Sequence, residues 1–105
     1  MVNQLLLSGV ICRQPIRKQS PSGIIHCLFV LKHRSQQQEA GYWRQAWCRM
    51  EVIISGHHAD EMLTNQLTAG SQVEVRGFLS NSQGHRGLNR LVLHAKSVKL
   101  TYSGE

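Results

Sequence analysis

The sequence predicts an all-β fold, a five-stranded barrel with a short helix between the third and fourth strands, in one domain over residues 1–105. Three observations predict it. Residues 42–54 alternate apolar and polar side chains with a period of two, which is typical of a strand with one buried face. Residues 58–67 instead place apolar side chains at helical spacing. A chain of 105 residues has room for one hydrophobic core.

Five segments have the composition of strands. They are residues 4–12, 26–34, 42–54, 72–80 and 90–100. In the first strand, Gly9 marks a bulge or a tight bend, as at the corner of a barrel. In the third strand, one face is apolar throughout, whereas Trp47 and Arg49 belong to the opposite face. In the fourth strand, we expect Val73 and Val75 to point into the core.

The segments between these strands have the composition of connections. Residues 13–23, 35–41 and 81–89 are polar and contain Gly, Pro or Gln, so we expect three loops there. Ser55-Gly56 ends the third strand, and the predicted helix at 58–67 is closed by Ala69-Gly70. Three strands, a short helix and two further strands make up the arrangement of the OB-fold, a partly open barrel.

The charge of the chain favours an anionic ligand. Twelve Lys and Arg stand against six Asp and Glu, which gives a formal net charge of +6. Residues 1–38 contain five basic residues and no acid, and residues 57–74 contain three acids and no Lys or Arg. Residues 75–105 are basic again. Two separated basic blocks suggest a polyanion bound on one side of the molecule, although a basic surface can also serve solubility alone.

The sequence contains no catalytic constellation, so we do not expect an enzyme, a cofactor or a small-molecule substrate. Cys12, Cys27 and Cys48 are odd in number and form no C-x-x-C pair, which is typical of reduced thiols in a core. His26 beside Cys27 comes nearest to a metal site, but neighbours on a strand point to opposite faces. We find no signal peptide and no apolar run of membrane-spanning length, so we expect a cytoplasmic protein without a membrane partner.

The third strand carries the strongest binding signal. Trp47 lies on its polar face, where a large aromatic ring leaves apolar area in water unless something covers it. Trp43 has the same parity, and Tyr42 opens the strand. Nucleic-acid bases stack on aromatic side chains for about 1–3 kcal/mol each, and Lys32 and Arg34 on the neighbouring strand can meet the phosphates. The alternative for Trp47 is a position under a loop or at a subunit contact.

Two loops add hydrogen-bond donors. The loop at 81–89 contains two glycines and, in OB-folds, commonly clamps a ligand. Its donors are His85, Arg86 and the adjoining Arg90, and those of the loop after the first strand are Arg13, Arg17 and Lys18. Each loop can also be an ordinary solvated connection.

Six strings carry a family resemblance that runs nearly end to end. They are Leu7-Ser-Gly-Val, Ser20-Pro-Ser-Gly-Ile-Ile-His-Cys27, Arg44-Gln-Ala-Trp-Cys48, Ile54-Ser-Gly-His57, Gly77-Phe78 and Leu91-Val-Leu-His-Ala95. With these strings the chain resembles the bacterial primosomal replication protein N (PriB) family, with one extra residue in the helix region.

This resemblance implies a homodimer of OB-folds that binds single-stranded DNA without sequence preference. It also implies a role in restarting stalled replication forks, with PriA helicase and DnaT as partners. The DNA-binding positions that it implies are Lys18, Arg34, Tyr42 and Trp47, together with the loop between the last two strands. We also expect Arg44, which begins one of the matching strings, to contact DNA.

The chain departs from the family in two places. Relatives are lysine-rich in the loop between the last strands, whereas here Gln83, His85, Arg86 and Arg90 occupy the region and no lysine does. We therefore expect affinity for DNA to depend more on Arg86, Arg90 and the strand face than on clamping by this loop. The chain also lacks the long acidic-tipped tail of general single-strand-binding proteins, so we expect partners to be recruited by the folded surface.

Two other ligands stay open. The exposed face around Trp47 can belong to a protein-interaction module, which a weak salt dependence of binding would indicate. RNA or double-stranded DNA can also be the main ligand, although a duplex hides its base faces inside the stack.

Overall fold

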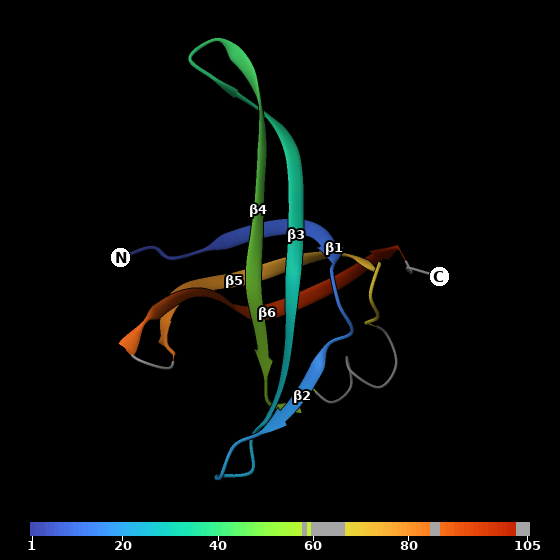
Figure 1. Ribbon diagram of the computed structural model, residues 1–105, viewed down its shortest axis with the longest axis vertical. Helices are drawn as coiled ribbons and strands as arrows, with labels where there is room; N and C mark the ends of the chain where they lie inside the picture. Colours follow the sequence, from blue (N-terminus) through green and yellow to red (C-terminus); the bar gives the residue numbers. More distant parts are fainter. Residues whose placement is uncertain (58, 60–66, 85–86, 103–105) are drawn as a thin grey trace.

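The computed structural model describes residues 1–57, 59, 67–84 and 87–102, and within them it confirms the all-β class (Figure 1). The strands are β1 (Leu5–Ile11), β2 (Ile16–Gln19), β3 (Ile25–Glu39), β4 (Tyr42–Ser55), β5 (Gln72–Gln83) and β6 (Asn89–Tyr102). No helix in the described part of the chain is both long enough and apolar enough to cross a membrane.

The six strands pair in the order β1-β5-β6-β4-β3-β2, and β1 also pairs with β3 through Val10–Lys32 and Ile11–Leu31. Five of the strands are thereby joined in a ring of pairings, with β2 attached to β3 outside it. Every pairing is antiparallel except the short one between β4 and β6. Figure 1 shows β3 and β4 crossing steeply over β1, β5 and β6.

The core lies on the inner side of this ring, on the faces that the alternation of side chains predicts. It comprises Ile11, Cys27, Phe29, Leu31, Val52, Ile54, Ala59, Leu67, Val73, Val75 and Leu93. Val73 and Val75 are both fully buried, as expected, and Leu79 packs against the cluster. Because the other side of β3 and β4 faces outward, the polar residues of those strands are available for binding.

Glycine permits two close approaches between strands. A Cβ at Gly9 would lie 2.3 Å from the carbonyl oxygen of Lys32, so this position is glycine because β1 meets β3 there. A Cβ at Gly77 would lie 2.0 Å from the carbonyl oxygen of His94, next to a register shift between β5 and β6. Gly9 therefore serves a strand contact that closes the ring of pairings.

The prediction of five strands was wrong, because residues 16–19, expected in a loop, form β2. Four residues are too few to show an alternation, and the prolines and glycines on either side dominate the composition. β2 turns back onto β3 through Ser20, whose carbonyl accepts from the Gly23 amide and whose hydroxyl accepts from the Ile24 amide. The strand is thus held by a local turn and by its pairing with β3.

The predicted loop at 35–41 was also wrong. β3 and β4 stay paired out to Glu39 and Tyr42, and only Ala40 and Gly41 form the turn. This outer part is exposed on both faces because it extends beyond the body and covers no core (Figure 1). The loop expected at 81–89 is shorter, since β5 runs to Gln83 and β6 begins at Asn89. The predicted helix at 58–67 falls almost wholly outside the described residues.

Candidate nucleic-acid interface

The pairing of β3 with β4 gathers the predicted site residues on one surface. Residues opposite each other in an antiparallel pair lie on the same face. We define the outer hairpin face as four such pairs: Lys32–Arg49, Arg34–Trp47, Gln36–Gln45 and Gln38–Trp43. Both indoles are exposed, each at 69% of its area, so Trp47 is covered neither by a loop nor by another described part of the chain. The face therefore offers flat apolar surfaces alternating with hydrogen-bond donors.

Cations and an aromatic ring meet at the inner end of this face. Lys32, Arg34, Trp47 and Arg49 line one pocket of about 260 Å³ together with Gln45 and Ala46. Arg34 and Lys32 lie directly across the ladder from Trp47 and Arg49. A guanidinium or ammonium group beside an indole suits a nucleotide, whose base can stack while its phosphate pairs with the cation.

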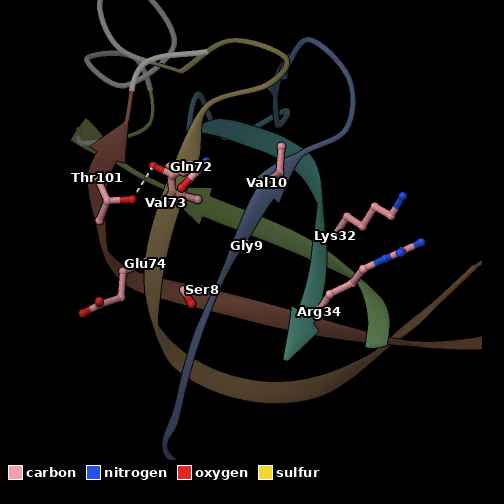
Figure 2. A pocket seen from close by; sticks show the side chains of 9 residues that line it. All are labelled: Ser8, Gly9, Val10, Lys32, Arg34, Gln72, Val73, Glu74 and Thr101. Atoms are coloured by element: carbon pink, nitrogen blue, oxygen red, sulfur yellow. Dashed lines mark hydrogen bonds between the residues drawn. The ribbon is translucent and has the colours of Figure 1, made fainter. Parts of the chain in front are cut away.

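Lys32 and Arg34 also border a second, broader depression of about 710 Å³ between β3 and β1. Figure 2 shows both side chains extending together from β3, whereas Glu74 points away from them on the opposite side. Ser8, Gly9 and Val10 of β1 form the floor between. Positive charge is thus concentrated on the β3 side of this depression.

Tyr42 and Arg44 do not join the outer hairpin face. They have the opposite parity in β4, so they lie on the other side of the hairpin from Trp43 and Trp47. Tyr42 is 76% exposed. The Nη1 of Arg44 donates to Oε1 of Glu39 at 2.6 Å, and both side chains are exposed. The two positions that the family resemblance and the matching string imply are therefore separated from the Trp47 platform.

A mostly apolar groove continues the outward surface beyond Lys32 and Arg49. It has a volume of about 210 Å³ and is lined by Ile16, Leu28, Phe29, Val30, Glu51, Val52, Ile53, Ser82, Arg90, Val92 and His94. At one wall, Nη1 of Arg90 donates to Oε1 of Glu51 at 3.1 Å. Sequence reasoning missed this ion pair, because it depends on β4 lying beside β6, a contact between distant parts of the chain.

The structure brings Lys18 to the end of the β5–β6 hairpin. Lys18 lines a depression of about 760 Å³ with Gln83, Gly84, Leu88, Asn89 and Arg90. Arg17 lies on β2 opposite Cys27 of β3, and Arg13 is exposed between β1 and β2. His85 and Arg86 lie outside the described residues. The first and last loops of the prediction therefore meet at Lys18 and Arg90.

The three cysteines are arranged neither as a metal site nor as a reactive centre. Burial raises the pKa of the Cys27 thiol to about 11, so the group stays protonated and inert at neutral pH. Cys12 and Cys48 are half-buried, and all three thiols are free. Among the described residues, no three His, Cys, Asp or Glu side chains gather in a way that could hold a metal ion. His26, the nearest sequence candidate, instead hydrogen-bonds to the Ser55 hydroxyl at 2.7 Å.

Comparison with known proteins agrees with this geometry. Residues 3–97 match a family described as another single-strand binding protein family. The replication restart protein PriB of Klebsiella pneumoniae is 57% identical over 105 residues, which is 100% of both chains.

Two solved structures have a similar fold. PriB from Ralstonia solanacearum has a TM-score of 0.78 at 22% identity and covers 97% of this chain and 100% of its own. A deletion variant of the single-stranded DNA binding protein from Thermus aquaticus has a TM-score of 0.79 at 20% identity, over 94% of this chain and 50% of its own. The chain therefore belongs to the PriB family of replication restart proteins, within a wider family of single-strand binding proteins.

Proposed function

We propose that this protein binds single-stranded DNA on the outer hairpin face and acts in replication restart. The observation that carries the proposal is the exposed indole of Trp47 beside Arg34, Lys32 and Arg49 in one pocket. Stacking on an indole does not discriminate between bases, because every base has a π-face. Phosphate contacts carry no sequence information either. Binding through these groups is therefore independent of sequence.

The proposed DNA path follows the outward surface of β3 and β4. It begins at Trp43 on the extended hairpin, passes Trp47 and its cations, and crosses the apolar groove toward Arg90 and Lys18. Trp43 and Trp47 are four residues apart, about 13 Å along a strand, which leaves room for nucleotides between the two rings. We also expect His85 and Arg86, which follow β5 in the sequence, to contact the DNA, with Arg13, Tyr42 and Arg44 as secondary contacts.

The ring of strand pairings supports an OB-fold barrel as the scaffold of this site. We further propose a cytoplasmic homodimer that binds no small-molecule substrate, performs no catalysis and recruits PriA helicase and DnaT. The support for these partners is membership of the PriB family. Sedimentation equilibrium tests the homodimer, and a mass equal to one chain at micromolar concentration would contradict it.

Quenching of tryptophan fluorescence by a thymine oligonucleotide tests the DNA site. Because both tryptophans are exposed, Trp43→Phe and Trp47→Phe variants are needed to separate their signals. We expect strong quenching from Trp47 and a log–log salt slope of about −0.7 for each phosphate contacted. Binding without quenching would show that DNA does not bind on the outer hairpin face.

Titrations of the same kind, with a protein partner or with a competing duplex, distinguish single-stranded DNA from the other ligands considered. A bound protein partner with little salt dependence, and no DNA binding at low salt, would establish the protein-interaction module instead. An equally long duplex that competes as well as the single strand would show that base stacking is not the basis of binding.

A further inference from the structure

Glu51 is an anion placed within a surface that we propose binds DNA. It is opposite Val30 on β3 and Val92 on β6, and it follows Arg49 by two residues on the same face of β4. Of the acids that the structure describes, Glu39 lies on the other face of the hairpin and Glu74 lies on β5, across the depression that Lys32 and Arg34 border. Glu51 instead lines the apolar groove of the proposed DNA path. A carboxylate here repels a passing phosphate, so its presence requires an explanation.

The Glu51 carboxylate forms an ion pair with the guanidinium of Arg90. Their Nη1–Oε1 distance is 3.1 Å, and the two side chains are 55% and 41% exposed for Arg90 and Glu51. Arg90 also borders both the apolar groove and the depression that contains Lys18, so it stands where the two parts of the proposed DNA path meet. A phosphate that binds there competes with Glu51 for the guanidinium, whose Nη1 already donates to Oε1 of Glu51.

We propose that Glu51 is an internal competitor of the DNA phosphate for Arg90, and so limits the affinity of this site. The inference rests on the proposed function and adds a regulatory element to it. A half-exposed ion pair is weak enough for DNA to displace, yet each displacement lowers the net gain from the phosphate contact. Sites that bind more weakly also release DNA more readily.

The test compares Glu51→Gln with Glu74→Gln in titrations with a thymine oligonucleotide at low salt. Both changes remove one negative charge, but Glu74 lies on the β1–β5 side and points away from Lys32 and Arg34 (Figure 2). We expect Glu51→Gln to bind about two to five times more tightly than Glu74→Gln, the range expected for an exposed ion pair. Raising the salt concentration should reduce this difference, because exposed charges are screened.

A double-mutant cycle with Arg90→Ala separates competition from general repulsion. If Glu51 competes for Arg90, the gain from Glu51→Gln should become smaller when residue 90 is alanine. An equal gain in both backgrounds, or equal affinities of Glu51→Gln and Glu74→Gln, would overturn the proposal. Failure of the unmodified protein to bind DNA would instead overturn the proposed function, so the two failures are distinguishable.

Discussion

Trp43 and Trp47 leave large apolar rings in contact with water, an arrangement that stabilises no part of the described fold. Each ring is 69% exposed, and both stand on the polar side of β4 rather than over the core. Such rings gain free energy when a flat ligand covers them. The neighbouring cations Arg34 and Lys32 favour a flat ligand that is also anionic.

Replacing Trp47 by alanine should weaken binding of single-stranded DNA by about 1–3 kcal/mol, because one stacking platform is lost. The free energy of unfolding should change little, since the indole lies outside the core. Leu91→Ala is a suitable control, because Leu91 is also an exposed apolar residue, at 50%, and is not part of the outer hairpin face. Equal affinities of Trp47→Ala and the unmodified protein would show that Trp47 does not contact the DNA.

Cys27 should resist alkylation by iodoacetamide at pH 8 in the folded protein. Burial raises its pKa to about 11, so only about one thiol in a thousand is ionised at that pH. Mass spectrometry of the labelled protein should show the half-buried Cys12 and Cys48 modified first. Rapid labelling of Cys27 without denaturant would contradict its burial.

The same shift makes stability depend on pH. Between pH 9 and pH 11 the unfolded chain loses the Cys27 proton while the folded protein keeps it. The free energy of unfolding should therefore fall as the pH rises through this range. Denaturant titrations should show a smaller fall for Cys27→Ala than for the unmodified protein.

At the scale of elements, the β3–β4 hairpin combines a core wall with a projecting ribbon. Its inner half buries Phe29, Leu31 and Val52, whereas its outer half has only exposed residues from Gln36 to Gln45. A two-stranded ribbon that packs against no core is marginally stable in water. We therefore expect the outer half to open locally more often than the core strands.

The turn of this hairpin offers a direct test. Ala40 and Gly41 have φ values of 52° and 83°, which are those of a two-residue type I′ turn. Alanine is strained in this region and asparagine is favoured there, so Ala40→Asn should stabilise the ribbon by about 0.5–1 kcal/mol. Amide exchange at residues 36–38 should slow by a factor of about two to five, with core amides unchanged. Faster exchange in Ala40→Asn would show that the turn has another geometry.

At the scale of the whole molecule, the charge of +6 is unevenly distributed. Lys32, Arg34 and Arg49 gather on the outward surface of β3 and β4. Lys99 of β6 instead lies opposite Glu74 of β5 in the strand register, on the other side of the ring. Phosphates should therefore be attracted to one side of the protein, and binding should respond to salt through the residues on that side.

Arg34→Ala should reduce the magnitude of the log–log salt slope by about 0.7, which corresponds to one phosphate contact on a single strand. Lys99→Ala removes the same charge away from the path and should leave the slope unchanged. The measurement is the affinity for a thymine oligonucleotide at several salt concentrations. Equal slopes for the two variants would show that binding depends on net charge alone.

The all-β class, the buried face of β4 and the exposure of Trp47 could all be predicted from the sequence. Each is a local property, because alternation along one strand decides which side chains share a face. For Gly9 the sequence predicted a bulge or a tight bend. The structure shows a close approach of β1 to β3 at this residue, where a Cβ would clash with the carbonyl oxygen of Lys32.

Other features could come only from the tertiary structure. β2 needs β3 as its partner, and the projecting ribbon needs residues 36–39, whose Gln-rich composition alone resembles a loop, to pair with the start of β4. Tyr42 and Arg44 were predicted to bind DNA together with Trp47, yet strand parity places them on the opposite face of the hairpin. The Glu51–Arg90 pair joins residues 39 positions apart. Side-chain periodicity reports the environment of one segment, whereas a contact between distant segments exists only once the whole chain has closed its ring of strands.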